Sequence, residues 1–265
     1  MPHTEASQKF ALDHMLERSE ISCTTGGNHR SSLLEAHSFT IVNRDFESTV
    51  SIQRNDLADD RYGVYKPSFS EMGQLARRHP EEMVMGLLAR GFSETGFDGQ
   101  NFFDTDHPIK DADDNEVTVS NMQDGTEPPW FLLDTSREVR PTIWQERENH
   151  DFQAMTGATN PHVFMNDEYI YGVKARVNAG FGLWQLAFGS KAVLSGENYA
   201  AARAAMMGFK SDGGRILGVT PTTLVVPPQL EEKALEILNA ERDASGATNV
   251  WQDTAELIVS PYLGA

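Results

Sequence analysis

Hydrophobic and polar positions alternate most regularly in residues 168–184, EYIYGVKARVNAGFGLW. Every odd position from 169 to 183 is apolar or small, whereas the even positions carry Lys174, Arg176, Asn178 and three glycines, with Ile170 and Trp184 at the ends. A period of two predicts a β-strand with one buried face. Ordinary strands run about 5–6 residues, so this length favours an extended sheet over a compact enzyme core. Two shorter strands joined at the glycines are the alternative.

Residues 36–53, AHSFTIVNRDFESTVSIQ, contain two further β-rich runs on either side of Asn43, Arg44 and Asp45. These turn-forming residues predict a β-hairpin. Its apolar side chains do not share one clean buried face; they are Phe39, Ile41, Phe46, Val50 and Ile52. An isolated hairpin is marginal in water, so this one needs support from its own body or from a neighbouring chain.

Helical signals occupy residues 68–91. Apolar stripes begin with Met72, Leu75 and Ala76 and continue with Met83, Val84, Leu87 and Leu88. Pro80 suits a first helical turn and Gly91 suits a helix end. The pattern predicts either two helices that meet at His79 or one helix kinked at Pro80. Residues 92–129 are rich in Gly, Asp, Asn and Pro, and this composition predicts a long structured loop.

The C-terminal half mixes strands and helices. Strands are expected at 130–133, near Ile143 and Trp144, at 222–227 and at 256–259, and helices at 196–207 and 229–241. Ser195 can cap the first of these helices and Gly208 can end it. Its many alanines favour close packing, and we expect Ala201 and Ala205 to be buried. The order is α+β, without a βαβ repeat or an internal repeat.

Charge narrows the function classes. The 265 residues hold 22 Lys and Arg against 39 Asp and Glu, a net charge of -17 with a pI of about 4.8. Such a surface repels phosphate backbones, so a nucleic-acid reader is disfavoured. The single Cys23 excludes an intramolecular disulfide and fits a reducing compartment. We expect neither a signal peptide nor a membrane span, because the first residues lack a basic start and no apolar run reaches about 20 residues.

Catalytic motifs are scarce. The sequence has no Walker-type phosphate loop and no GxSxG elbow. The best metal candidate is an acidic loop over 104–116, containing Asp104, Asp106, His107, Asp111, Asp113, Asp114 and Glu116. Clustered carboxylates suit hard cations, but the spacing fits no EF-hand, and a solvated acidic loop is the preferred interpretation. Glu146, Arg147 and Glu148 look like a catalytic charge cluster, yet such a run usually forms ion pairs on a strand or at an interface.

Several long segments, in order, carry a family resemblance: FDGQNFFDTDHP (97–108), WFLLDTSREVRPTIWQERE (130–148), DEYIYGVKARVNAGFGLWQLA (167–187) and LGVTPTTLVVPPQLEEKALEIL (217–238). They resemble the Mu-like prophage major head subunit, the family of phage major capsid proteins, over roughly residues 34–265. The resemblance implies an α+β, HK-97-type coat fold. This fold has an extended loop, a peripheral domain with a spine helix and long strands, and an axial domain with a central sheet and flanking helices.

Carried onto this chain, the resemblance implies an N-terminal arm at 1–33, an extended loop at 34–66, a peripheral domain at 67–194, an axial domain at 195–253 and a C-terminal strand at 254–265. Residues 1–33 themselves do not resemble the family. We expect subunit interfaces at the five apolar side chains of 36–53 and at Glu146, Arg147 and Glu148.

The implied function is structural. The family's members self-assemble into pentamers and hexamers of an icosahedral shell that encloses double-stranded DNA without reading its sequence. Expected partners are further copies of the chain, a scaffold, a portal and a maturation protease, and assembly takes place in the host bacterial cytoplasm, away from any membrane. No catalytic residue, cofactor or metal is expected. The alternatives are a metal-dependent hydrolase that uses the loop at 104–116 and a binding module unrelated to capsids.

Overall fold

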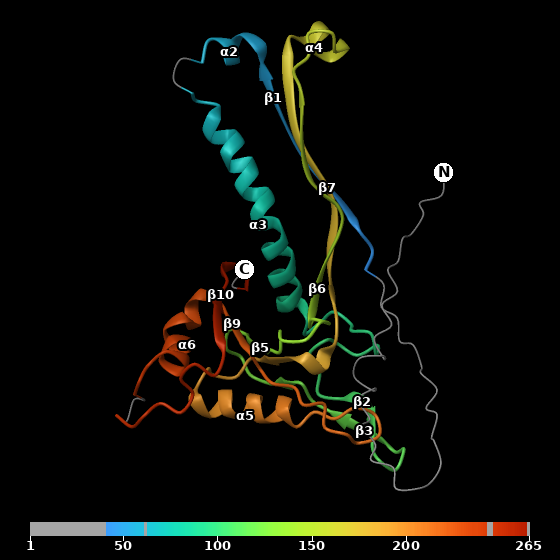
Figure 1. The fold of residues 1–265 in the computed structure, drawn as a ribbon, viewed down its shortest axis with the longest axis vertical. Coiled ribbons are helices and arrows are strands. Elements are labelled where there is room, and N and C mark those ends of the chain that lie inside the picture. The colour runs from blue at the N-terminus through green and yellow to red at the C-terminus, as the bar shows by residue number, and fades with distance from the viewer. Residues whose placement is uncertain (1–40, 61–62, 243–245, 264–265) are drawn as a thin grey trace. The chain divides into compact units, whose positions relative to one another are not determined.

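The computed structural model describes residues 41–60, 63–242 and 246–263. Predictions for the arm at 1–33 and for Phe39 fall outside these residues. The described chain divides into two compact units. We call residues 41–84 and 144–180 the first unit, and residues 85–143 and 181–263 the second unit. The chain passes from one unit to the other within a helix, α3, and within two strands, β6 and β7 (Figure 1).

A three-stranded sheet in the order β1-β7-β6 forms the first unit, together with three helices (Figure 1). Their bounds are β1 (Arg44–Gln53), α2 (Arg54–Ala58), α3 (Lys66–Arg90), β6 (Thr142–Met155), α4 (Pro161–Asn166) and β7 (Glu168–Phe181). The short helix α4 joins β6 to β7 at the tip of their hairpin.

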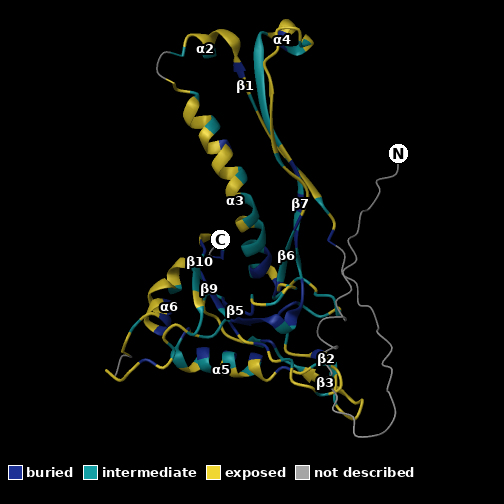
Figure 2. Ribbon diagram, in the orientation of Figure 1, coloured by how far each residue is buried: buried dark blue, intermediate teal, exposed yellow. Residues whose placement is uncertain are grey.

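Strand β7 is one continuous strand of 14 residues, so the long strand is confirmed and the two-strand alternative is wrong. Ala175, Val177 and Ala179 are buried, as the alternation predicts, whereas the N-terminal half is half-buried on both faces (Figure 2). The period of two therefore reports a buried face only in the second half of the strand.

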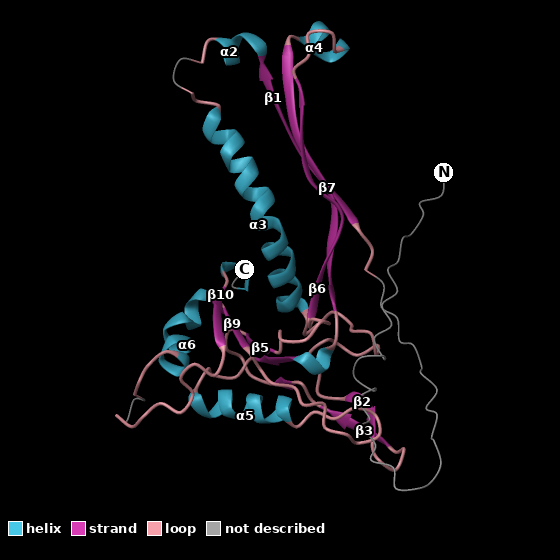
Figure 3. Cartoon of the chain, viewed as in Figure 1, coloured by secondary structure: helices cyan, strands magenta, loops and turns pink. Residues whose placement is uncertain are grey.

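The hairpin expected around residues 43–45 does not form in the described residues. Arg44 and Asp45 lie inside β1 and pair with Val177 and Arg176 in an antiparallel register that runs on to Gln53 opposite Glu168. Ten successive pairs with β7 outweigh the local turn tendency of these residues, because Asn and Asp tolerate turn angles without requiring them. The segment that follows β1 is the short helix α2 (Figure 3).

Helix α3 is a single helix of 25 residues that runs through Pro80, so separate helices meeting at His79 are ruled out. It ends directly before Gly91, as predicted, where a Cβ atom would overlap the Phe103 ring. Met72 is buried, but Leu75 is 58% exposed and does not belong to the buried stripe.

Five strands in the order β10-β9-β5-β8-β4 form the sheet of the second unit. The strands and helices here are β4 (Met122–Gln123), β5 (Trp130–Leu133), β8 (Ala187–Ser190), α5 (Gly196–Met207), β9 (Thr223–Val226), α6 (Glu231–Leu238) and β10 (Glu256–Val259), with 3-10 turns η1 (Trp184–Leu186), η2 (Pro228–Leu230) and η3 (Pro261–Leu263). The segment expected to be loop also contains a two-stranded hairpin of β2 (His107–Lys110) and β3 (Glu116–Val119). The range 195–253 supplies only β9 to the five-stranded sheet.

Both faces of this sheet are covered. In β5, Trp130 and Leu132 join a core cluster that contains residues of α5 and α6. Phe131 and Leu133 join a second cluster with Leu88 of α3 and Trp184. Burial on both faces explains why β5 and β9 read as continuous apolar runs instead of alternating ones.

Helix α5 begins and ends where the sequence predicts. The Ser195 side chain accepts a hydrogen bond from the Asn198 backbone N–H at 3.2 Å, and Gly208 follows the last helical residue. The buried alanine is Ala202, however, whereas Ala201 is exposed and Ala205 is half-buried against the core. The helical period places residue 202 on the face of the other buried residues of α5 and turns residue 201 away, so the expectation for Ala201 is wrong.

Candidate assembly surface

An ion-pair network joins the three strands of the first unit. The guanidinium group of Arg176 on β7 lies 3.0 Å from Asp45 on β1 and 3.2 Å from Glu148 on β6. Arg176 donates a hydrogen bond to the Glu148 carboxylate, and this bond, with Asp45 adding to its effect, raises the pKa of Arg176. The expectation that Glu148 forms an ion pair on a strand is confirmed. Glu146 and Arg147 are exposed on β6, and the assignment of all three residues to a subunit interface stays a prediction.

The apolar side chains assigned to an interface have partners inside the first unit. Ile41 and Ile52 are buried in their own chain. Ile41 packs so closely on β7 that a Cβ at Gly180 would overlap its side chain, and its carbonyl oxygen accepts a hydrogen bond from Gln145 at 3.2 Å. Both residues thus help to hold the sheet together, whether or not a neighbouring subunit also reaches them.

A pair of histidines lies between α3 and the sheet. His79 Nδ1 and His150 Nε2 are 3.1 Å apart, and the Phe46 ring meets the His79 ring edge-on at 4.3 Å between centroids. Burial lowers the pKa of His79, His150 lowers it further, and Glu82 partly opposes both effects. Two rings at this distance share one proton in a hydrogen bond, whereas two imidazolium rings repel each other. A neutral His79 ring therefore keeps the hydrogen bond between α3 and β6, and the lowered pKa of His79 favours that ring.

An open groove of about 480 Å³ lies between β1 and α3. We call it the β1–α3 groove; its apolar lining is Val50, Pro67, Met72 and Leu75, and its polar lining includes Ser48 and Glu71. Leu75 leaves most of its side chain in water here. Val50, predicted to lie at an interface, is half-buried in this groove.

Sequence reasoning missed the tip of the β6–β7 hairpin. Phe164 and Met165 on α4 are 79% and 77% exposed, higher fractions than those of the other exposed large apolar side chains of the described chain. We call these two residues the α4 knob. The signal was present, because Asn160 followed by Pro161 is typical of a helix start, and Asn160 does accept a hydrogen bond from the His162 N–H at 2.9 Å.

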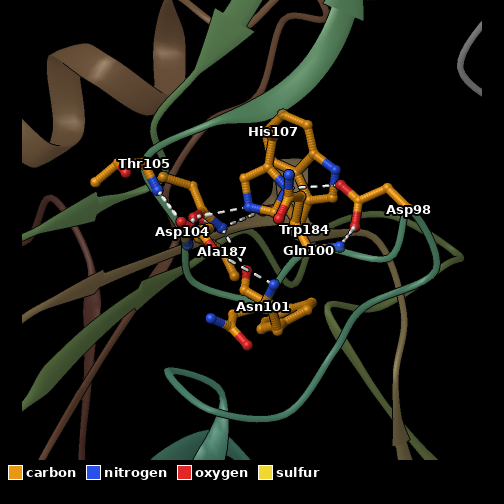
Figure 4. Close-up of polar contacts among 10 residues, drawn as sticks. Asp98, Gln100, Asn101, Asp104, Thr105, His107, Trp184 and Ala187 are labelled. Atoms are coloured by element: carbon orange, nitrogen blue, oxygen red, sulfur yellow. Dashed lines mark hydrogen bonds and ion pairs between the residues drawn. The ribbon is translucent and has the colours of Figure 1, made fainter.

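The acidic loop of the second unit is built around a buried histidine (Figure 4). His107 Nδ1 lies 2.6 Å from Asp98 Oδ2, its Nε2 lies 3.1 Å from Asn121 Oδ1, and its ring stacks on Trp184 at 4.0 Å between centroids. The Asn121 amide donates in turn to the Phe102 carbonyl at 2.8 Å. His107 therefore has a structural set of partners on both ring nitrogens.

Asp104 fixes the turn after Phe103, as predicted. Its carboxylate accepts from the Thr105 N–H at 2.7 Å and from the Asn101 N–H at 3.3 Å (Figure 4). Burial opposes its ionisation, but these backbone hydrogen bonds outweigh it and lower the pKa of Asp104. The adjoining Asp104 carboxylate raises the pKa of the exposed Asp106.

The rest of the loop is also organised by the chain itself. Asp111 accepts hydrogen bonds from the Asp113 N–H and the Asn115 N–H, at 2.8 and 2.9 Å, which closes the turn between β2 and β3. In the part of the chain that the structure describes, no three His, Cys, Asp or Glu side chains converge on a point that could hold a metal ion. No described helix is long and apolar enough to cross a membrane.

The long three-stranded sheet, the 25-residue helix and the covered five-stranded sheet are elements expected of a phage coat protein, and comparisons with solved structures place the chain in that class. The procapsid of bacteriophage JBD30 matches with a TM-score of 0.80 at 40% identity, over 99% of this chain and 88% of that one. The JBD30 capsid matches with a TM-score of 0.79 at 29% identity over the same shares.

Curated sequences agree as well. The major capsid protein of Escherichia phage Mu is 41% identical over 239 residues, 87% of this chain and 78% of that protein. The Mu-like prophage FluMu major head subunit of Haemophilus influenzae is 39% identical over 248 residues, 89% of this chain and 80% of that protein. The model of the Mu-like prophage major head subunit gpT family matches residues 25–263. The chain belongs to this family of phage major capsid proteins, which confirms the resemblance and the fold class. The match begins at residue 25, so the expectation that residues 1–33 do not resemble the family is wrong for residues 25–33.

Proposed function

We propose that this chain is the repeating tile of an icosahedral phage head, in which pentamers and hexamers of the chain enclose double-stranded DNA. The observation that carries the proposal is the match of 99% of the chain to a procapsid subunit at 40% identity. The matches do not support a metal-dependent hydrolase or an unrelated binding module, because the relatives are structural capsid proteins. We propose accordingly that the chain carries out no catalysis.

The charge of the chain suits this role. A subunit with a net charge of -17 does not bind tightly to a packaged phosphate backbone, so DNA can move over the shell during filling. A shell of acidic subunits also needs specific contacts that overcome long-range repulsion. We propose a scaffold, a portal and a maturation protease as partners, and assembly in the host bacterial cytoplasm.

The domain boundaries from the sequence enter the same proposal. Residues 34–66 would form the extended loop, 67–194 the peripheral domain and 195–253 the axial domain at the centre of each capsomer, with the C-terminal strand at 254–265. β1 lies within the range proposed for the extended loop, and α3 is the helix proposed as the spine.

Expression of the full chain followed by negative-stain microscopy tests the proposal. Rings, sheets or closed shells are expected, whereas uniform small particles would refute it. Arg147→Glu tests the interface predicted on β6, with Lys210→Glu as a matched control because both replace an exposed cation by a carboxylate. If only Arg147→Glu lowers the shell yield, the result supports a contact on β6. If both variants lower the yield equally, the change in net charge alone accounts for the loss.

A further inference from the structure

We propose that the α4 knob of one copy inserts into the β1–α3 groove of a second copy. The inference rests on the proposed shell function and names one contact within it. Both parts belong to the first unit, and each is incomplete in a single chain. The knob exposes Phe164 and Met165 to water, and the groove does the same for Leu75.

The knob is presented in a fixed direction. Val163 is buried beneath α4, so the following two side chains of this short helix point outward. Asp167 ends the helix in a left-handed conformation with φ of 54°, and its N–H donates to the Val163 carbonyl at 3.0 Å. The Asp167 carbonyl accepts a hydrogen bond from the Arg54 N–H at 2.9 Å, which ties α4 to the start of α2. Little backbone freedom of α4 is therefore left to lose when the knob binds.

The groove has the size and chemistry for this occupant. A volume of about 480 Å³ accommodates two large apolar side chains. Val50, Met72 and Leu75 provide apolar walls, and methionine side chains on both partners adapt to irregular surfaces. An aromatic side chain that enters an apolar pocket is the usual energetic centre of a protein interface.

The occupant is a second copy because the chain's own knob does not fill its own groove. Phe164 is 79% exposed within its own chain. The relatives of this chain form shells from many copies, so a neighbour's knob is always present at high local concentration. Knob and groove are different patches, and such head-to-tail contacts continue from copy to copy instead of stopping at dimers, forming rings where the rotation closes.

Disulfide trapping tests the contact. Cys23 is the only cysteine in the chain, so Cys23→Ser gives a background without thiols. Phe164→Cys and Leu75→Cys are then combined in one chain, and the assembled protein is oxidised and run on a denaturing gel. A knob-to-groove contact gives a ladder of linked chains, whereas a link within one chain changes mobility without a ladder. Phe164→Cys with Val250→Cys is the control, because Val250 is similarly exposed but lies in the second unit.

The outcomes separate the contact from the shell function. Shells with a ladder, absent from the control pair, support both. Shells without a ladder, or with an equal ladder in the control, overturn the contact and leave the function standing. If the unmodified chain forms no shells, the proposed function is overturned. A ladder in smaller oligomers of the Phe164→Cys and Leu75→Cys chain then still supports the contact, and the absence of that ladder overturns both.

Removal of the knob gives an independent measurement. Phe164→Ser combined with Met165→Ser should raise the protein concentration needed for assembly about tenfold or more. Val250→Ser should leave that concentration unchanged. Equal thresholds for the knob variant and the unmodified chain, with circular dichroism showing both folded, would overturn the proposal.

Discussion

Ala202 is the side chain whose enlargement gives the sharpest test of the second unit. It is fully buried on α5, in the cluster that also contains Tyr199, Met206 and Leu224. Ala202→Leu inserts three additional carbon atoms where no space is left. Overpacking of this kind costs about 1–3 kcal/mol of the free energy of unfolding. A unit of this size loses roughly 2–4 °C in melting temperature for each kcal/mol, so a decrease of roughly 2–12 °C is expected.

Ala201→Leu is the matched control on the same helix. Residue 201 is exposed, so the same substitution should change the free energy of unfolding by no more than about 0.5 kcal/mol. Tryptophan fluorescence during denaturant unfolding reports on the second unit through Trp130, Trp184 and Trp251, three of the four tryptophans in the chain. Equal stability of the two variants would refute the packing of α5 described above.

Three further predictions concern charge. The free energy of unfolding should decrease as the pH is lowered below about 6.5, the ordinary pKa of histidine, because the lowered pKa of His79 favours the neutral ring in the folded state. His150→Phe should weaken this pH dependence in acid melts followed by Trp144 fluorescence. Asp98→Ala should cost about 1–3 kcal/mol by leaving the buried His107 Nδ1 without its hydrogen-bond partner, whereas Asp106→Asn should have little effect; denaturant titration distinguishes them, and equal losses would contradict the network. Added salt should speed assembly of this acidic chain, because screening shortens to about 8 Å near physiological ionic strength; faster assembly at low salt in light scattering would show that complementary patches dominate.

Signals within short stretches of sequence predicted the elements whose formation depends mainly on neighbouring residues. The Ser195 cap, the helix stop at Gly91 and the buried strand Thr223–Val226 follow from backbone chemistry and hydrophobic runs, and each is present. The long strand β7 was predictable for the same reason, because its alternation persists over many residues.

Long-range pairing explains the misses. Arg44 and Asp45 look like turn residues until β7 supplies their hydrogen-bonding partners more than 130 positions later. Leu75 fits a helical stripe, yet its side chain faces the open β1–α3 groove and not a core. The histidine pair joins residues 79 and 150, and the spacing in the chain gives no sign of it. Knowledge of which segments meet was needed for each of these features.

Over the described residues, the chain passes between its two units at three places, within α3, β6 and β7. Neither unit is therefore encoded by one uninterrupted stretch of gene. A single proteolytic cut in one of these elements leaves the two units tethered by the other two, so limited digestion should nick the chain without releasing either unit. A tile built this way tolerates damage that would sever two domains joined by a single linker.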